Sequence, residues 1–350
     1  MKRQIRSAIV GYGPVFNFGK AHGTWMTAVP EIKLVAVCDK DPARTAVAKR
    51  DFPDIETYNH LPAMLERGDI DLVSVVVPHN LHKDVVIECL RAGKHTIVDK
   101  PMAIAVAECD AMIEEARRAG RTLAVFHNRR HDGNYRTIHR IVRGGELGDV
   151  FRIELWTAYY GAPGKGWRSQ ADACGGALYD WGAHAVDWVL GLVPSPVVSV
   201  TGFAQKRVWM DFDIEDEMRA IIRFENGAVA EVATSNISLV GKPLWTILGT
   251  NGAIVDTGED ALRGYCPEYR PVARSNGSLR LVTLRDGKRE ERTVPYDPSD
   301  WMTYYTDMAR HLLDGAPVPV SGEDGRRVIA VLEAAKRSAR SGKSESPAVG

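Results

Sequence analysis

The fold is decided near the start of the chain, where Ile-Arg-Ser-Ala-Ile-Val (5–10) runs directly into Gly11-Tyr12-Gly13-Pro14-Val15-Phe16-Asn17-Phe18-Gly19. The apolar run predicts a buried strand, and the following pattern predicts a helix that begins near Lys20. Glycines at a strand-to-helix turn allow a tight bend and let a pyrophosphate approach the backbone at the helix N-terminus. The usual pattern is G-x-G-x-x-G, and here the third glycine arrives three residues late, which predicts an enlarged loop.

Short apolar runs alternate with helix-like patterns through residues 1–126. Five runs each predict a buried strand: Ile5–Val10, Leu34–Cys38, Leu72–Val77, Thr96–Val98 and Leu123–Phe126. Between them, apolar residues recur at helical spacing, as in Val85-Val86-Cys89-Leu90 and Met112-Ile113-Ala116. This alternation predicts an α/β dinucleotide-binding domain built on a doubly wound parallel sheet.

The pattern changes in residues 127–350, which we assign to a second, α+β domain for substrate binding and oligomerisation. Phe151, Ile153 and Leu155 alternate with Arg152, Glu154 and Trp156, as in a half-exposed strand. Turn pairs at Asn226-Gly227, Asn251-Gly252 and Asp286-Gly287 predict hairpins. We therefore expect an open, largely antiparallel sheet with flanking helices.

Two helices are predicted near the C-terminus, at about 301–313 and 323–340. Ser321 and Asp324 resemble a capping box for the second of these helices. Its buried stripe is predicted to consist of Val328, Val331, Leu332 and Ala335. The tail after Arg340 is expected to be frayed.

Composition limits the class of protein. The 350 residues suggest about two domains, and 45 Lys+Arg against 45 Asp+Glu give no electrostatic case for nucleic acid or an anionic membrane. The longest uncharged run, Trp188 to Gln205, is broken by prolines and glycines and is read as a helix end, a turn and a strand start. Five cysteines without C-x-x-C spacing favour reduced thiols in the cytoplasm and no metal site: Cys38, Cys89, Cys109, Cys174 and Cys266.

Asp39 closes the second predicted strand, where an acid can accept hydrogen bonds from a ribose diol. Its carboxylate would repel a 2′-phosphate, so NAD is favoured over NADP. The plainer alternative is a solvated Asp that starts the turn at Asp41-Pro42. The complete set of residues predicted to bind the cofactor is Gly11, Gly13, Phe16, Asn17, Gly19, Asp39, Pro78, Asn80, His82, Asp99 and Lys100.

The last five of these residues follow strands of the predicted sheet, at the edge where open α/β sheets bind ligands. A second polar cluster lies in Gly176-Ala177-Leu178-Tyr179-Asp180-Trp181-Gly182-Ala183-His184. If this segment is helical, Asp180 and His184 lie one turn apart on the same face. Taken by themselves, these groups could equally be a surface lysine and a helix-stabilising pair.

The motifs together resemble the Gfo/Idh/MocA oxidoreductase family. Asp99-Lys100-Pro101 is similar to the family's E-K-P signature, with Asp in place of the commoner Glu. A second signature is matched by Gly176-x-x-x-Asp180-x-Gly182-x-His184-x-x-Asp187, and weaker matches occur at Trp167-Arg168 and Val320-Ser321-Gly322-Glu323-Asp324-Gly325. The resemblance implies a nicotinamide-binding Rossmann domain, a second domain whose sheet supports oligomer contacts, and oxidation of a sugar or cyclitol hydroxyl. It also implies that Lys100, Asp180 and His184 form the catalytic set.

The chemistry of these side chains suits the implied roles. Removal of hydride from a carbinol carbon requires that the hydroxyl proton leave, and neutral imidazole accepts a proton near pH 7. We therefore assign His184 as the general base. Lys100 can donate a hydrogen bond to the developing alkoxide, and Asp180 can orient His184 or hold a neighbouring hydroxyl.

Aromatic faces beside charged side chains suit a small polyhydroxylated ring. The residues predicted to bind substrate are Lys100, Asn128, Tyr160, Trp167, Arg168, Asp180 and His184. A homo-oligomer, dimer or tetramer, is expected through the C-terminal sheet. Two alternatives stay open: an NAD-dependent glycosidase that works by transient oxidation and elimination, and a non-catalytic NAD-binding sensor.

Overall fold

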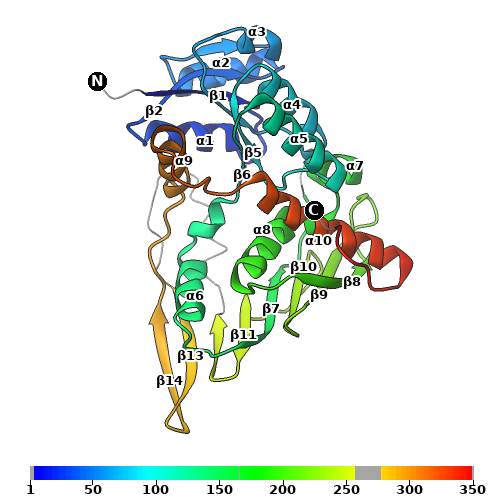
Figure 1. Cartoon of the computed structure of the whole chain (residues 1–350). Helices are drawn as coiled ribbons and strands as arrows, with labels where there is room; N and C mark the ends of the chain where they lie inside the picture. The colour runs from blue at the N-terminus through cyan, green and yellow to red at the C-terminus, as the bar shows by residue number, and fades with distance from the viewer. Residues whose placement is uncertain (1–3, 165, 257–276, 349–350) are drawn as a thin grey trace. The chain divides into compact units, whose positions relative to one another are not determined.

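The computed structural model describes residues 4–164, 166–256 and 277–348, which divide into two compact units (Figure 1). The first unit contains residues 4–127 together with Trp301–Arg326. The second contains the other described residues. The predicted boundary at 126/127 lies one residue from the observed division, but the prediction had assigned 301–326 to the second domain. The chain instead returns to the first unit, where the Tyr304 hydroxyl donates a 2.9 Å hydrogen bond to the Val125 carbonyl.

The first unit is built on a parallel sheet with strand order β3-β2-β1-β4-β5-β6, which confirms the predicted doubly wound α/β fold. Its strands are β1 Ile5–Val10, β2 Ile32–Cys38, β3 Glu56–Tyr58, β4 Leu72–Val75, β5 His95–Asp99 and β6 Leu123–Phe126. The prediction missed β3 because its three residues include no buried apolar side chain to mark them. It also extended β4 by two residues.

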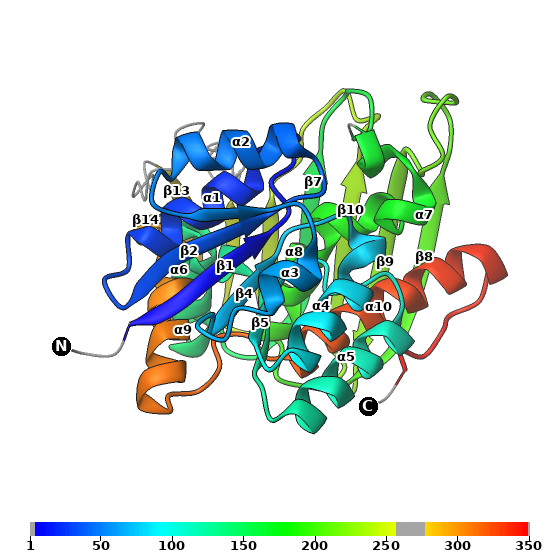
Figure 2. The same cartoon turned by 90° about the horizontal axis from the view of Figure 1, so that it is seen from above.

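Helices cover both faces of this sheet. They are α1 Phe18–Thr27, α2 Pro42–Asp51, α3 Leu61–Leu65, α4 His82–Arg91, α5 Val106–Ala119 and α9 Thr303–Asp314. Figure 2 shows α1 and α2 on one side of the strands and α4 and α5 on the other. Helix α5 illustrates the local cause: Val106, Cys109, Met112 and Ala116 form its buried stripe, and Gly120 ends it in a left-handed conformation. Helix α1 begins two residues before the predicted start.

The second unit contains an eight-stranded sheet with order β14-β13-β12-β11-β7-β10-β9-β8. Its strands are β7 Val150–Ala158, β8 Val197–Gln205, β9 Glu217–Phe224, β10 Val229–Ser235, β11 Trp245–Gly249, β12 Gly252–Asp256, β13 Ser278–Arg285 and β14 Lys288–Pro295. All neighbouring pairs are antiparallel except β7 and β10. The largely antiparallel sheet and its three hairpin turns are confirmed. In β7 the buried alternation starts at Ile153, because Phe151 is 48% exposed.

The described helices of the second unit are α6 Gly133–Arg143, α7 Ala171–Cys174, α8 Ala177–Leu192 and most of α10 Gly322–Ser341. Helix α8 packs on β10, β9 and β7. Its Trp188 ring lies 5.5 Å from Trp245 of β11 and 5.7 Å from Tyr135 of α6, measured between ring centroids. The run from Trp188 to Gln205 is the predicted helix end, turn and strand start. These aromatic contacts fix α8 against the sheet.

Helix α10 begins as predicted, with the Asp324 N–H donating a 3.1 Å hydrogen bond to the Ser321 hydroxyl. All four residues of its predicted buried stripe are buried. Ile329, Ala330 and Ala334 are buried as well, so the buried face of the helix is wider than predicted. The tail after Arg340 was wrongly expected to be frayed. Glu345 exchanges two backbone hydrogen bonds with Val200 of β8, at 2.8 and 2.9 Å, and these tie the tail to the sheet edge.

Cys38, Cys89, Cys109 and Cys174 are buried reduced cysteines, and Cys266 lies outside the described residues. No helix among the described residues is long and apolar enough to cross a membrane. Within the same part of the chain, no group of three or more His, Cys, Asp or Glu side chains could hold a metal ion.

Candidate active site

The glycine loop after β1 has the shape that a pyrophosphate requires. Gly11 has a φ of +100°, and a Cβ there would lie 2.1 Å from the Val76 carbonyl oxygen. A Cβ on Gly19 would lie 2.5 Å from the Gly11 carbonyl oxygen, so Gly19 takes the close-packing role despite its late position. A Cβ on Gly13 would meet nothing within 4 Å. The loop is therefore closed at Gly11 and Gly19 and open at Gly13, which fits a dinucleotide.

The three extra residues of the loop end in two left-handed positions. Phe16 and Asn17 have φ values of 64° and 49°, and Asn17 immediately precedes α1 without a side-chain cap on that helix. Left-handed backbone is uncommon in residues other than glycine, although Asn adopts it more readily than Phe, and both residues are exposed here. No side chain caps the first turn of α1, and the N-terminus of a helix is a position that suits an anion such as a pyrophosphate.

Asp39 lies at the end of β2 as predicted, but its carboxylate also shapes the loop. Its Oδ2 accepts a 2.6 Å hydrogen bond from the Tyr12 N–H, and its Oδ1 accepts one of 3.0 Å from the Asp41 N–H. Arg44 of α2 donates from Nε to the Tyr12 carbonyl at 2.8 Å. Asp39 and Arg44 thus hydrogen-bond to the N–H and to the carbonyl of the same residue, Tyr12. Sequence reasoning missed Arg44 because nothing in its surroundings marks it.

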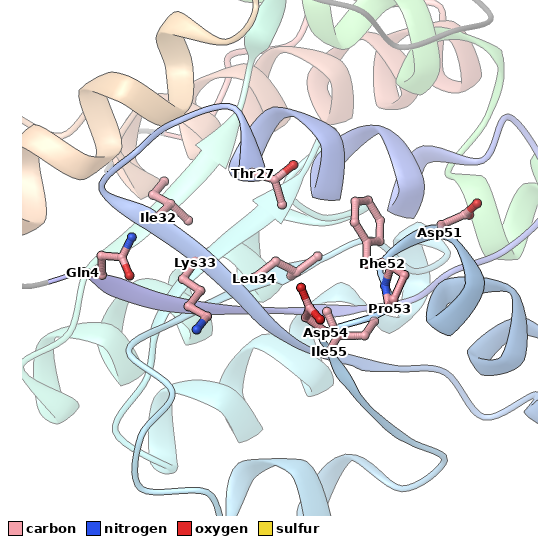
Figure 3. A pocket seen from close by; sticks show the side chains of 10 residues that line it. All are labelled: Gln4, Thr27, Ile32, Lys33, Leu34, Asp51, Phe52, Pro53, Asp54 and Ile55. Atoms are coloured by element: carbon pink, nitrogen blue, oxygen red, sulfur yellow. The ribbon is translucent and has the colours of Figure 1, made fainter.

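Tyr12 extends this support to the far end of α2. Its hydroxyl donates a 2.8 Å hydrogen bond to Asp51, which also forms a 2.8 Å ion pair with Lys20 of α1. Asp51 in turn lines a surface hollow of about 510 Å³ beside the first residues of β2 (Figure 3). The hollow contains none of the predicted site residues. It lies at the amino end of β2, whereas the glycine loop meets the carboxyl end.

The turn after β5 carries Lys100. Asp99 ends the strand, its Oδ1 accepts a 2.8 Å hydrogen bond from the Lys100 N–H, and a cis peptide bond joins Lys100 to Pro101. His82 is fully buried at the start of α4 beside this turn. Its Nδ1 lies 3.0 Å from the Pro101 carbonyl and its Nε2 lies 3.0 Å from the Val77 carbonyl.

These contacts change the role of His82. It was predicted to bind the cofactor, but both of its ring nitrogens face backbone carbonyls and burial lowers its pKa to about 4. The side chain is therefore a neutral imidazole that contacts the protein's own backbone, and its single ring N–H donates to the carbonyls on one side only. Pro78 immediately precedes the 3-10 helix His79–Leu81, and Asn80 is exposed in that turn, as a cofactor contact requires.

A second buried histidine supports the same sheet. Nδ1 of His22 in α1 lies 2.5 Å from the Tyr305 hydroxyl of α9, which also lies 3.2 Å from the Ser74 hydroxyl of β4. Burial lowers the pKa of His22 to about 4, although the charge of Asp99 acts in the opposite direction. His22 is thus neutral at physiological pH.

In the second unit, Asp180 and His184 lie one turn apart on α8, which confirms the predicted helix. The His184 side chain is buried, and its ring lies 6.1 Å from Trp181 and 6.3 Å from Trp188. Burial and then the charge of Asp180 raise the pKa of Tyr159, which places that phenol within electrostatic reach of the acid. Arg129 stacks on Trp181 at 4.5 Å from the ring centroid and pairs with Asp132 at 2.8 Å.

The amino end of α8 is held by side chains from distant parts of the chain. Glu215 Oε2 accepts a 3.0 Å hydrogen bond from the Ala177 N–H, the first residue of the helix. Lys336 of α10 donates a 2.7 Å hydrogen bond from Nζ to the Gly175 carbonyl. The buried Asp216, beside Glu215, accepts backbone hydrogen bonds from Arg207 and Val208, each of 2.6 Å. Sequence reasoning named none of these supports.

The predicted substrate residues of this unit form more than one group. Arg168 stacks on Trp167 at 4.3 Å from the ring centroid, within the 3-10 helix Gly166–Ser169. Asn128 is buried in the 3-10 helix Asn128–His131, next to Arg129. The Tyr160 ring packs 5.7 Å from Trp209 and is half exposed. The structure therefore pairs Trp167 with Arg168 and places Asn128 beside the Arg129–Trp181 stack, whereas Tyr160 belongs to a separate aromatic contact.

A glycine loop at the switch point of a parallel sheet, in a chain whose second unit carries an acid–histidine pair on a sheet-packed helix, defines an NAD(P)-dependent oxidoreductase. Residues 5–127 match the family model described as the oxidoreductase family with an NAD-binding Rossmann fold, and residues 135–255 match the C-terminal domain of the same family. The chain belongs to the Gfo/Idh/MocA oxidoreductase family.

The similar proteins include dehydrogenases for both nicotinamide cofactors. The chain is 29% identical over 345 residues to scyllo-inositol 2-dehydrogenase (NADP(+)) IolW of Bacillus subtilis, covering 96% of this chain and 94% of the relative. It is 29% identical over 260 residues to scyllo-inositol 2-dehydrogenase (NAD(+)) of the same organism, covering 73% and 74%. The structure of the oxidoreductase yvaA from Bacillus subtilis superposes with a TM-score of 0.86 at 27% identity, covering 99% and 98%.

Proposed function

We propose that the protein oxidises a hydroxyl group of a sugar or cyclitol to a carbonyl with a nicotinamide cofactor, or catalyses the reverse reduction. The observation that carries this proposal is the presence of Lys100 in the turn after β5 and of Asp180 and His184 one turn apart on α8. These are the positions that match the family's two signatures. Two relatives along most of the chain are named as scyllo-inositol dehydrogenases, which supports a polyhydroxylated substrate.

Each catalytic side chain has a distinct role in the proposal. The nicotinamide supplies the hydride acceptor when it is bound. His184 accepts the hydroxyl proton, since a neutral imidazole is the side chain suited to this transfer near pH 7. Lys100 stabilises the negative charge that develops on the substrate oxygen. Asp180 orients His184 or holds a second hydroxyl, and Trp167 with Arg168 offers a stacking face and a charged donor to the ring.

For the cofactor, the proposal is a preference for NAD over NADP. The support is the Asp39 carboxylate at the end of β2, where a 2′-phosphate would meet a like charge. Arg44 is a positive charge that contacts the same residue, since it donates to the Tyr12 carbonyl. NADH and NADPH affinities measured by fluorescence titration test the preference. We expect tighter binding of NADH and a reduced difference in Asp39→Ala, and tighter NADPH binding by the wild-type protein would refute it.

The activity is tested with a panel of inositols, monosaccharides and sugar acids, each assayed with NAD and with NADP at 340 nm. We expect reduction of cofactor with at least one cyclitol or sugar and none with simple alcohols. The same panel includes p-nitrophenyl glycosides. Release of nitrophenol without net NADH would instead identify a glycosidase, and binding of NADH with no turnover of any compound would favour a sensor.

A further inference from the structure

The side chain of His82 contacts the turn that carries Lys100. The Nδ1 atom of His82 lies 3.0 Å from the Pro101 carbonyl and 3.3 Å from the Met102 carbonyl. Its Nε2 atom lies 3.0 Å from the carbonyl of Val77, which follows β4. One imidazole thus lies between the two backbone segments that leave the neighbouring strands β4 and β5, and with its single proton on Nδ1 it donates to the turn after β5.

His82 holds one side of Lys100, and Asp99 holds the other. The held carbonyl belongs to Pro101, the residue directly after Lys100, while the Lys100 N–H donates 2.8 Å to Asp99 Oδ1. The His82 side chain is fully buried, so water does not replace its contacts. The backbone from which the Lys100 ammonium extends is therefore contacted by two side chains, at the Lys100 N–H and at the Pro101 carbonyl that follows it.

We propose that His82 is a positioning residue for Lys100, which acts on the reaction by fixing the Pro101 and Met102 carbonyls and so the direction of the lysine. This inference rests on the proposed function in naming Lys100 as catalytic. It differs from the predicted role of His82 as a cofactor ligand. The contact that matters is the one at Nδ1, because only that nitrogen reaches the turn.

The two ring nitrogens can be separated by substitution. In His82→Asn the amide nitrogen approximates the place of Nδ1, and in His82→Gln it approximates the place of Nε2. We expect His82→Gln to lower kcat roughly ten- to hundredfold, since misplacement of a catalytic group by about 1 Å has effects of that size. We expect His82→Asn to restore most of kcat. NADH affinity, measured by fluorescence, should change less than about threefold in His82→Gln.

His22→Gln is the matched control. His22 is as deeply buried as His82 and has a similarly lowered pKa, but its ring nitrogen contacts Tyr305 instead of the lysine turn. We expect its melting temperature to fall while kcat stays within about twofold of wild type. Equal losses of kcat in His82→Asn and His82→Gln, or a loss in His22→Gln as large as theirs, would overturn the proposal.

A second measurement does not depend on turnover. The rate at which Lys100 reacts with an amine-acylating reagent in the cofactor-free protein is read by mass spectrometry, with the exposed Lys33 as the internal reference. We expect the Lys100 rate relative to Lys33 to change at least threefold in His82→Gln and to return toward wild type in His82→Asn. An unchanged ratio overturns the positioning role. If the wild-type protein shows no dehydrogenase activity, the proposed function fails but this test still decides the role of His82.

Discussion

The turn after β5 and the amino end of α8 carry the proposed catalytic groups, and they are supported in opposite ways. The lysine turn is held by a neutral, fully buried imidazole that faces backbone carbonyls. The end of α8 is held by charged side chains, Glu215 on a backbone N–H and Lys336 on a carbonyl. Fully buried contacts between neutral groups are costly to remove but resist salt, whereas charge at a part-buried helix end contributes less and is partly screened. The two regions should therefore respond differently to mutation, pH and salt.

The largest expected effect tests whether both regions serve catalysis. Lys100→Met and His184→Gln should each lower kcat by roughly 10²- to 10⁴-fold, because each removes a group that stabilises charge or moves a proton. NADH affinity should stay close to wild type in both variants. The control is Lys33→Met, which removes an exposed lysine of the first unit. Near-normal kcat in either variant would remove that residue from the mechanism.

The glycine loop predicts the next largest effect, which separates folding from binding. Gly11→Ala should prevent stable folding, since a Cβ would lie 2.1 Å from the Val76 carbonyl oxygen at a φ of +100°. Gly13→Ala should fold with a near-normal melting temperature, because its Cβ meets nothing within 4 Å. The same Cβ projects where a pyrophosphate would approach, so NADH affinity should fall at least about tenfold. Unchanged NADH affinity in Gly13→Ala would contradict the loop assignment.

Acid should reduce the stability contributed by the buried histidines of the first unit and by Asp216 of the second unit in different pH ranges. Burial lowers the pKa values of His22 and His82 from 6.5 to about 4, so between these values protons bind the unfolded chain more than the folded one. Their stabilisation is therefore full above pH 6.5 and falls as the pH drops toward 4, by roughly 1.4 kcal/mol per pH unit for each histidine.

Burial raises the pKa of Asp216, but hydrogen bonds to Val208 and Arg207 outweigh it, and the net pKa is lowered. This carboxylate stabilises the second unit above the usual Asp pKa of about 3.9 and loses that effect only below it. Urea unfolding at pH 5 and pH 7 checks the difference, and His22→Gln should show a shallower dependence on pH than wild type. An equal dependence in both proteins would contradict the buried neutral state of His22.

The smallest effect concerns the charge at α8. Glu215→Gln keeps an oxygen acceptor for the Ala177 N–H but removes the negative charge at the helix N-terminus. We expect a loss of about 0.3–1 kcal/mol in the free energy of unfolding, smaller at high salt. Glu231→Gln is the control, because Glu231 pairs with Arg219 between two strands of the sheet. A loss that does not depend on salt would show that Glu215 acts through its shape and not its charge.

Much of this fold could be predicted because periodicity reports burial directly. The strands β1 and β6, the turn at Asn226-Gly227 and helix α8 each have a local signal in apolar spacing or turn residues. Strand β3 has no such signal because none of its three side chains is buried. The return of α9 to the first unit depends on contacts such as Tyr304 with Val125, which lie 179 residues apart and leave no local pattern.

The candidate site shows the same division between local and distant information. Asp180 and His184 could be paired from their spacing, and Lys100 could be placed at a strand end. The support of these residues could not be predicted, since Glu215 reaches α8 from 38 residues away and His82 reaches the lysine turn from 19 residues away. The contacts of His82 could not be predicted because a histidine that follows a strand has the same sequence whether it faces a ligand or the backbone.

The central claim is that Lys100 and His184 act in one chemical step, and a double-mutant cycle on kcat tests it most directly. We predict that Lys100→Met/His184→Gln is at most a few-fold slower than the slower single variant, because groups that act as a unit are strongly non-additive. The measurement uses the substrate found in the panel, with saturating cofactor and a melting curve for each variant. Losses that multiply in the double variant would contradict the claim and assign the two residues to independent roles.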